Sequence, residues 1–131
     1  MNLEEKKKIT LSLIDTFNKA GKVALDLREA GLIKETKSDS TPVSNGDIEV
    51  NKLLTKKIKE ITPNIIIVSE ESANHKQDID LNNFWLIDPI DGTRDYINNR
   101  NEFTLNASLI LDKKPAIGII TAPAKNRVFY S

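Results

Sequence analysis

Two short acidic segments hold the residues of this sequence that could do chemistry. The first, residues 88–93, reads Asp-Pro-Ile-Asp-Gly-Thr and follows an apolar run. We expect that run to be a strand that delivers Asp88 to its end, with a turn at Pro89 that brings Asp91 back to the same space. Two carboxylates and the Ile90 carbonyl are hard oxygen ligands, which Mg²⁺ prefers together with water and phosphate.

Gly92 and Thr93 extend this motif toward phosphate chemistry. Because Gly92 has no side chain, an anion can approach the backbone, and the amides that follow would open a short helix toward it. The alternative is that Asp-Pro and Asp-Gly are ordinary turn formers. The complete string, with an apolar run before it and a hydroxyl after it, favours the functional interpretation.

The second acidic segment, residues 69–72, reads Ser-Glu-Glu-Ser and follows another apolar run. Adjacent acids by themselves usually form a solvated loop. If both runs belong to one sheet, however, Glu70 would lie beside Asp88 and Asp91, where like charges repel unless a cation neutralises them. Asp47 is a further candidate, although a helix capping box explains this residue equally well.

Composition narrows the class of protein. The 131 residues suffice for one domain, and Lys+Arg and Asp+Glu both number 19, so no excess of cations is present to bind nucleic acid. The absence of Cys excludes disulfides, thiolate metal sites and thiol nucleophiles. No apolar run reaches the roughly 18 residues of a membrane helix, and the charged start does not resemble a signal peptide. We expect a cytoplasmic protein without an integral membrane segment, with peripheral association at the inner face of a bacterial membrane as an alternative.

Hydrophobic spacing predicts two helices ahead of the acidic segments. Residues 3–30 place apolar side chains at helical intervals and end at Gly31, a suitable C-cap, with an interruption near Gly21 as an open alternative. A second helix is expected to begin at Ser44 and to end before Pro63. The apolar side predicted for it consists of Ile48, Leu53, Leu54, Ile58 and Ile61.

The second half of the chain changes to strand-like patterns. The apolar runs at 65–68 and 84–87 are typical of buried strands. Residues 104–111 and 116–122 are predicted to form an antiparallel hairpin, and residues 127–130 begin a third strand of that meander. Two helices followed by such strands indicate an α+β fold, with two helices packed on a mainly antiparallel sheet.

At this point the motifs carry a family resemblance. Residues 88–93, preceded by 69–71, resemble the magnesium-dependent, lithium-sensitive inositol monophosphatase superfamily. Residues 94–97, 101–106 and 37–47 are more similar to its 3′(2′),5′-bisphosphate nucleotidase branch than to its inositol branch.

The resemblance implies a particular architecture. The α+β unit would be the first half of the sugar-phosphatase αβαβα sandwich, so residues 1–131 would form an N-terminal metal-binding domain and the second domain would be absent. The expected second half, with its Trp-Asp motif, has no counterpart here. Such a chain is expected to be a poor enzyme by itself, and to self-associate or to require a separately encoded second half.

The resemblance also implies roles for individual residues. Glu70, Asp88 and the Ile90 carbonyl would bind one Mg²⁺, and Asp88 and Asp91 would help to bind a second, so the intact site would hold two or more ions. Thr93, oriented by Asp47, would help Glu70 to position and deprotonate the water that attacks a phosphate monoester. The substrate-binding residues implied are Ile90, Asp91, Gly92 and Thr93.

The expected function is therefore Mg²⁺-dependent hydrolysis of 3′-phosphoadenosine 5′-phosphate to AMP and phosphate. An inositol-1-phosphate monophosphatase is the alternative within the enzyme class, because the metal motif is shared. A noncatalytic remnant or metal-binding interaction module is the alternative outside it. The expected partner is a small phosphorylated substrate and not a nucleic acid.

Overall fold

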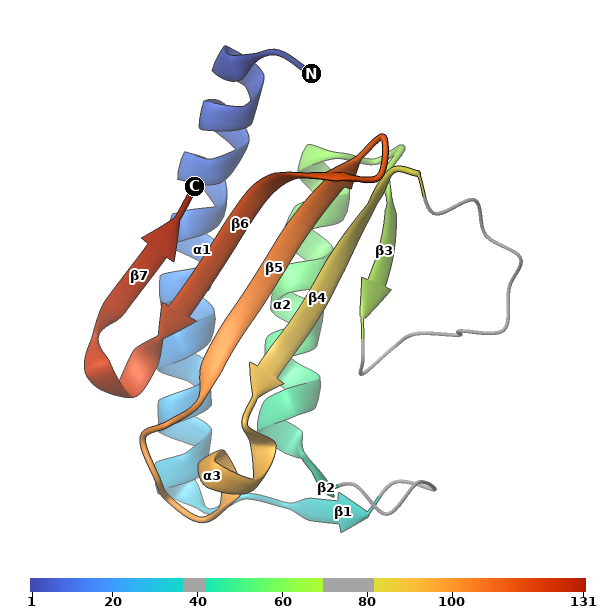
Figure 1. The fold of residues 1–131 in the computed structure, drawn as a ribbon. Helices are drawn as coiled ribbons and strands as arrows, with labels where there is room; N and C mark the ends of the chain where they lie inside the picture. The colour runs from blue at the N-terminus through green and yellow to red at the C-terminus, as the bar shows by residue number, and fades with distance from the viewer. Residues whose placement is uncertain (37–41, 70–81) are drawn as a thin grey trace.

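The computed structural model describes residues 1–36, 42–69 and 82–131 (Figure 1). In chain order the elements are α1 (Leu3–Ala30), β1 (Lys34–Thr36), β2 (Pro42–Ser44), α2 (Asn45–Ile61), β3 (Ile66–Ser69), β4 (Phe84–Asp91), α3 (Thr93–Ile97), β5 (Thr104–Leu111), β6 (Lys114–Ala122), the 3₁₀ turn η1 (Pro123–Lys125) and β7 (Arg127–Tyr130).

The main sheet has five strands in the order β3-β4-β5-β6-β7. β3 and β4 run parallel, and every other neighbouring pair in this sheet is antiparallel. The short strands β1 and β2 pair with each other apart from the main sheet. The α+β prediction of two helices on a mainly antiparallel sheet is therefore confirmed.

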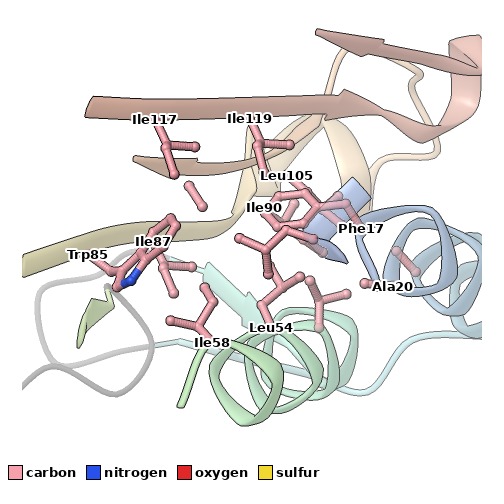
Figure 2. Close-up of a cluster of buried hydrophobic side chains, with 14 of the residues drawn as sticks. Phe17, Ala20, Leu54, Ile58, Trp85, Ile87, Ile90, Leu105, Ile117 and Ile119 are labelled. Carbon is pink, nitrogen blue, oxygen red and sulfur yellow. The ribbon is translucent and has the colours of Figure 1, made fainter. Parts of the chain in front are cut away.

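Both long helices cover the same face of the sheet, and the core lies between these two layers (Figures 1 and 2). Figure 2 shows side chains of α1 and α2 pointing toward apolar side chains of β4, β5 and β6. Burial of each large aliphatic side chain contributes about 1.5–3 kcal/mol, so this contact layer fixes the position of the helices on the sheet. The labelled core residues are Phe17, Ala20, Leu54, Ile58, Trp85, Ile87, Ile90, Leu105, Ile117 and Ile119.

α1 is continuous from end to end, so the alternative of an interruption near Gly21 was wrong. A Cβ atom at Gly21 would lie 3.0 Å from Pro123 Cγ, so the glycine allows the helix to approach η1 closely. The predicted C-cap is confirmed, because Gly31 adopts a φ of 101° and its amide donates to the Arg28 carbonyl.

The second helix has the predicted bounds, but its buried face differs from the prediction. Ile48 and Leu53 are exposed, whereas Val50 is fully buried. The reason is that two polar side chains, Asp47 and Asn51, occupy the buried face and make hydrogen bonds there. The predicted apolar side therefore included residues that do not face the core, because the prediction considered apolar residues alone.

Candidate active site

The strand that carries the first acidic motif is longer than predicted. We expected it to end at Asp88 before a turn at Pro89, but β4 continues through Asp91. Asp88 pairs with Asn106, and Asp91 pairs with Thr104. Between these two pairs the chain advances by three residues along β4 but by only two along β5, so β4 contains one extra residue. This extra residue is a β-bulge, the kind of position at which a sheet tolerates a proline.

The bulge places both aspartates on the same face of the sheet. In a regular strand, residues three apart point to opposite faces. Here Trp85, Ile87 and Ile90 are all buried toward the helices, so the alternation shifts by one residue between Ile87 and Ile90. Asp88 and Asp91 consequently lie on the face that α1 and α2 leave uncovered, where Asp91 is exposed.

β3 supports the expected position of the second acidic motif. Its last residue, Ser69, pairs with Ile87 in the parallel register, so the residues that precede Glu70 and Asp88 are neighbours. The Ser69 hydroxyl donates to Asn51 Oδ1 on α2, and both side chains are buried. Glu70 itself lies outside the described residues, so its convergence with Asp88 stays a prediction.

Asp47 is fully buried and uses its two carboxylate oxygens for different purposes. Oδ2 accepts hydrogen bonds from the Ser44 amide at 2.8 Å and from the Ser44 hydroxyl at 2.6 Å, within the predicted capping box. Oδ1 accepts a hydrogen bond from Thr93 Oγ1 at 2.9 Å. The capping interpretation of Asp47 and its contact with Thr93 therefore hold at the same time.

The turn that follows Asp91 requires a glycine. Gly92 adopts a φ of 89°, and a Cβ atom there would lie 2.9 Å from the carbonyl oxygen of Glu102. The predicted short helix after this turn is α3, which begins at Thr93. The Thr93 hydroxyl also lies 3.1 Å from the Ile90 carbonyl oxygen. With one proton, it donates to either this carbonyl or Asp47.

The contact between α2 and α3 depends on a glycine and a tyrosine that the sequence analysis missed. A Cβ atom at Gly46 would come within 2.2 Å of the Tyr96 hydroxyl oxygen. Tyr96 is fully buried, and its hydroxyl donates to the Ala24 carbonyl at 2.6 Å. A glycine inside a helix is unfavourable by itself, so Gly46 within a predicted helix was the available signal of a close approach.

Burial is the main cause of a raised pKa at Tyr96. Desolvation, and secondarily the negative charge of Asp47, raise the pKa of Tyr96 from 10.0 to about 12, while Arg28 acts in the opposite direction. The Arg28 guanidinium lies 5.0 Å from the ring centre of Phe103 and 5.6 Å from that of Tyr96. It also donates to the Arg100 carbonyl, which ties the end of α1 to the segment after α3.

Comparison with known proteins places the chain in a family. The model of the inositol monophosphatase family matches residues 5–131. The chain belongs to this family. It is 33% identical over 123 residues to the 3′(2′),5′-bisphosphate nucleotidase CysQ of Aggregatibacter actinomycetemcomitans, a match that covers 91% of this chain and 45% of that protein. It is 41% identical over 88 residues to CysQ of Buchnera aphidicola, covering 66% of this chain and 33% of that protein. The chain thus spans less than half the length of these curated relatives.

Solved structures of the inositol monophosphatase fold superpose on nearly the whole chain. The extragenic suppressor protein suhB of Bartonella henselae gives a TM-score of 0.83 at 21% identity, covering 95% of this chain and 48% of that one. The Thermotoga maritima IMPase gives a TM-score of 0.79 at 24% identity, covering 90% of this chain and 45% of that one. These similarities show that the described architecture matches half of the family fold.

In this family member, the described residues offer oxygen atoms that could hold a metal ion, but not a complete group of acidic side chains. Within 1–36, 42–69 and 82–131, no three acidic, His or Cys side chains are grouped to hold a metal ion. The described donors are the carboxylates of Asp88 and Asp91 and the Ile90 carbonyl, all hard oxygens. Next to them, Asn106 Oδ1 is buried and accepts no hydrogen bond from the described residues. Neutral and anionic oxygens of this kind fit a hard divalent cation.

The helices of the described residues give no sign of a membrane span. None of them combines the length and the apolar character that crossing a bilayer requires.

Proposed function

We propose that this chain contributes the metal-binding part of a Mg²⁺-dependent phosphatase of the 3′(2′),5′-bisphosphate nucleotidase type. One observation carries the proposal. The bulge in β4 sets Asp88 and Asp91 on one face of the sheet, and the same segment leads into Thr93, whose hydroxyl contacts the buried carboxylate of Asp47. Acidic ligands and a fixed hydroxyl next to them are the groups that hydrolysis of a phosphate monoester requires.

The metal ligands would be Asp88, Asp91 and the Ile90 carbonyl, with Glu70 as the further carboxylate that the family resemblance implies. When bound, Mg²⁺ supplies positive charge that lowers the pKa of water and neutralises charge on phosphate. The protein contributes the arrangement of the carboxylates, because the bulge and the β5 pairing keep Asp88 and Asp91 together against their mutual repulsion.

Thr93 is the proposed positioning group for water. When its hydroxyl donates to Asp47 Oδ1, its oxygen lone pairs remain available to accept a hydrogen bond from a nearby water. Asp47 is itself held by Ser44, so this acceptor for the Thr93 hydroxyl is in place before any substrate binds. Gly92 allows the sharp turn into Thr93, because a Cβ atom there would lie 2.9 Å from the carbonyl oxygen of Glu102.

The substrate we propose is 3′-phosphoadenosine 5′-phosphate, hydrolysed to AMP and phosphate. Support comes from the curated relatives, which are named 3′(2′),5′-bisphosphate nucleotidases and are 33–41% identical to the chain over the aligned residues. The solved structures do not bear on the substrate, because their identities to this chain fall below 25%.

The proposed metal site is tested by the effect of Mg²⁺ on unfolding. A ligand that binds only the folded state stabilises it by about 2.7 kcal/mol at one hundred times its dissociation constant. We expect Mg²⁺ to raise the Tm of the wild-type chain and Asp88→Asn to lose most of that increase. Asp15→Asn is the matched control, because Asp15 is an exposed aspartate on α1. A Tm indifferent to tens of millimolar Mg²⁺ would contradict the metal site.

The proposed substrate is tested by a separate assay. Release of phosphate from 3′-phosphoadenosine 5′-phosphate is compared with release from inositol 1-phosphate, with and without Mg²⁺. We expect the nucleotide to be preferred wherever Mg²⁺-dependent activity is detected. Preference for inositol 1-phosphate would reassign the substrate. Mg²⁺ binding without hydrolysis of either compound would agree both with an interaction module and with the poor activity expected of a chain that spans less than half the length of its curated relatives.

A further inference from the structure

We propose that Asn106 is a positioning residue of the acidic site. Its amide holds the Asp91 carboxylate on the cation-binding face, and its carbonyl oxygen faces the same site as an acceptor for the hydration shell of the cation. This inference rests on the proposed function and adds a residue of β5 to a site whose described residues otherwise come from β4 and the segment after it.

The strand register places Asn106 in the centre of the site. It lies directly opposite Asp88 in the antiparallel pairing of β4 and β5. Asn106 in turn pairs with Ile120 on β6, and Ile120 pairs with Phe129 on β7; both are exposed apolar side chains. Asn106 is therefore the polar residue at which the uncovered face changes from apolar to acidic.

The nitrogen and the oxygen of the Asn106 side-chain amide have different surroundings. Nδ2 donates to Asp91 Oδ2 at 3.4 Å, which links β5 to the carboxylate beyond the bulge. Oδ1 is buried and accepts no hydrogen bond within the part of the chain that the structure describes. A buried acceptor without a partner is destabilising, so a side chain kept in this position indicates that a donor binds next to it.

The chemistry of an amide suits this position. Asp88 and Asp91 share a face, and two carboxylates close together repel each other. A lysine or arginine between them would relieve that repulsion but would also occupy the place of a divalent cation. The neutral amide of Asn106 donates a hydrogen bond to one carboxylate without adding a competing charge.

The test measures the Mg²⁺ concentration that gives half of the maximal increase in Tm. Asn106→Leu preserves the approximate size of the side chain and removes both polar ends. Loss of a residue that orients metal ligands typically weakens metal binding about 10- to 100-fold, so we expect a rise of at least about tenfold in that concentration. Ser108→Ala is the matched control, because Ser108 lies on the same strand and face but pairs with Leu86 instead of an aspartate. We expect its response to equal that of the wild type.

A second variant tests whether the side chain at position 106 faces the acidic site. Asn106→Lys places a cation next to Asp91, so we expect a higher Tm without Mg²⁺ and loss of the Mg²⁺ response. An unchanged Tm together with an unchanged Mg²⁺ response in Asn106→Lys would show that the side chain at position 106 does not face the acidic site.

Different results would contradict the proposed metal site and the proposed role of Asn106. If the wild type and Ser108→Ala respond to Mg²⁺ and Asn106→Leu responds at the same concentration, the inference about Asn106 is overturned while the metal site stands. If neither the wild type nor Ser108→Ala responds at any concentration, the metal site fails and the role of Asn106 fails with it.

Discussion

The Thr93 hydroxyl lies 2.9 Å from Asp47 Oδ1, although the two residues are 46 positions apart in the chain. The other oxygen of the same carboxylate completes the N-terminal cap of α2 through Ser44. One buried carboxylate therefore fixes both the start of a helix and the hydroxyl at the edge of the acidic site. Changes to the cap should consequently reach the site, and changes at Thr93 should reach the helix.

Replacement of Thr93 by Val should destabilise the fold without removing the response to Mg²⁺. The change keeps the shape of the side chain but deprives the buried Asp47 of a hydrogen bond, at a cost of about 1–3 kcal/mol. Urea unfolding with and without Mg²⁺ measures both effects, and Thr93→Ser is the control that retains the hydroxyl. In any preparation with phosphatase activity, we expect turnover of Thr93→Val to fall by about 10²-fold. Loss of the Mg²⁺ response in this variant would instead identify Thr93 as a metal ligand.

Removal of the cap at α2 should have a larger effect than removal of the cap at α1. Ser44→Ala deletes a buried N-cap, a change that typically costs about 0.5–2 kcal/mol, and also leaves Asp47 Oδ2 with one fewer donor. Asn2→Ala deletes the exposed N-cap of α1, which has no connection to the site. We expect Ser44→Ala to lower the Tm more than Asn2→Ala, and both variants to keep the increase in Tm that Mg²⁺ gives the wild type. Equal effects of the two changes would contradict the coupling.

Gly46→Ala should be strongly destabilising. The added methyl group would overlap the Tyr96 side chain, so α2 and α3 would have to separate and the Asp47–Thr93 contact would lengthen. Overpacking of this kind costs about 1–3 kcal/mol. Gly118→Ala is the control, because among the described residues no atom beyond its two chain neighbours lies within 4 Å of a Cβ at that position. Chemical denaturation compares the two, and a Gly46→Ala variant as stable as Gly118→Ala would disprove the close approach.

Stability should decline at high pH through Tyr96. The pKa of Tyr96 in the folded chain is raised from 10.0 to about 12, mainly by burial. A folded state that holds a proton more tightly than the unfolded chain is favoured below pH 10, and that advantage is lost as the pH rises through about 12. Tyr96→Phe should therefore flatten the decline of Tm between these pH values, whereas Tyr130→Phe should not, because Tyr130 is exposed. An unchanged decline in Tyr96→Phe would assign it to other groups.

The sequence by itself determined the elements whose signals are local. The spacing of apolar residues and the caps at Gly31 and Ser44 predicted both helices, because helical periodicity and capping involve residues only a few positions apart. The hairpin of β5 and β6 was predicted for the same reason, since its turn and alternating pattern are contiguous.

The acidic site was predicted in composition but not in geometry. The sequence indicated that Asp88 and Asp91 belong together, and it attributed this to a turn at Pro89 instead of a bulge within a continuing strand. A bulge is defined by the pairing with β5, and that pairing forms only when the sheet assembles.

Tertiary structure alone decided the orientation of α2 and the contacts that fix the site. The helix buries Asp47 and Asn51 and exposes Ile48, the reverse of what the hydrophobicity of these three residues favours. The hydrogen bonds that satisfy these polar groups come from Thr93 and Ser69, residues far away in the chain. Because a buried polar group is acceptable only where such a partner arrives, its position can be judged only after the distant segments have come together.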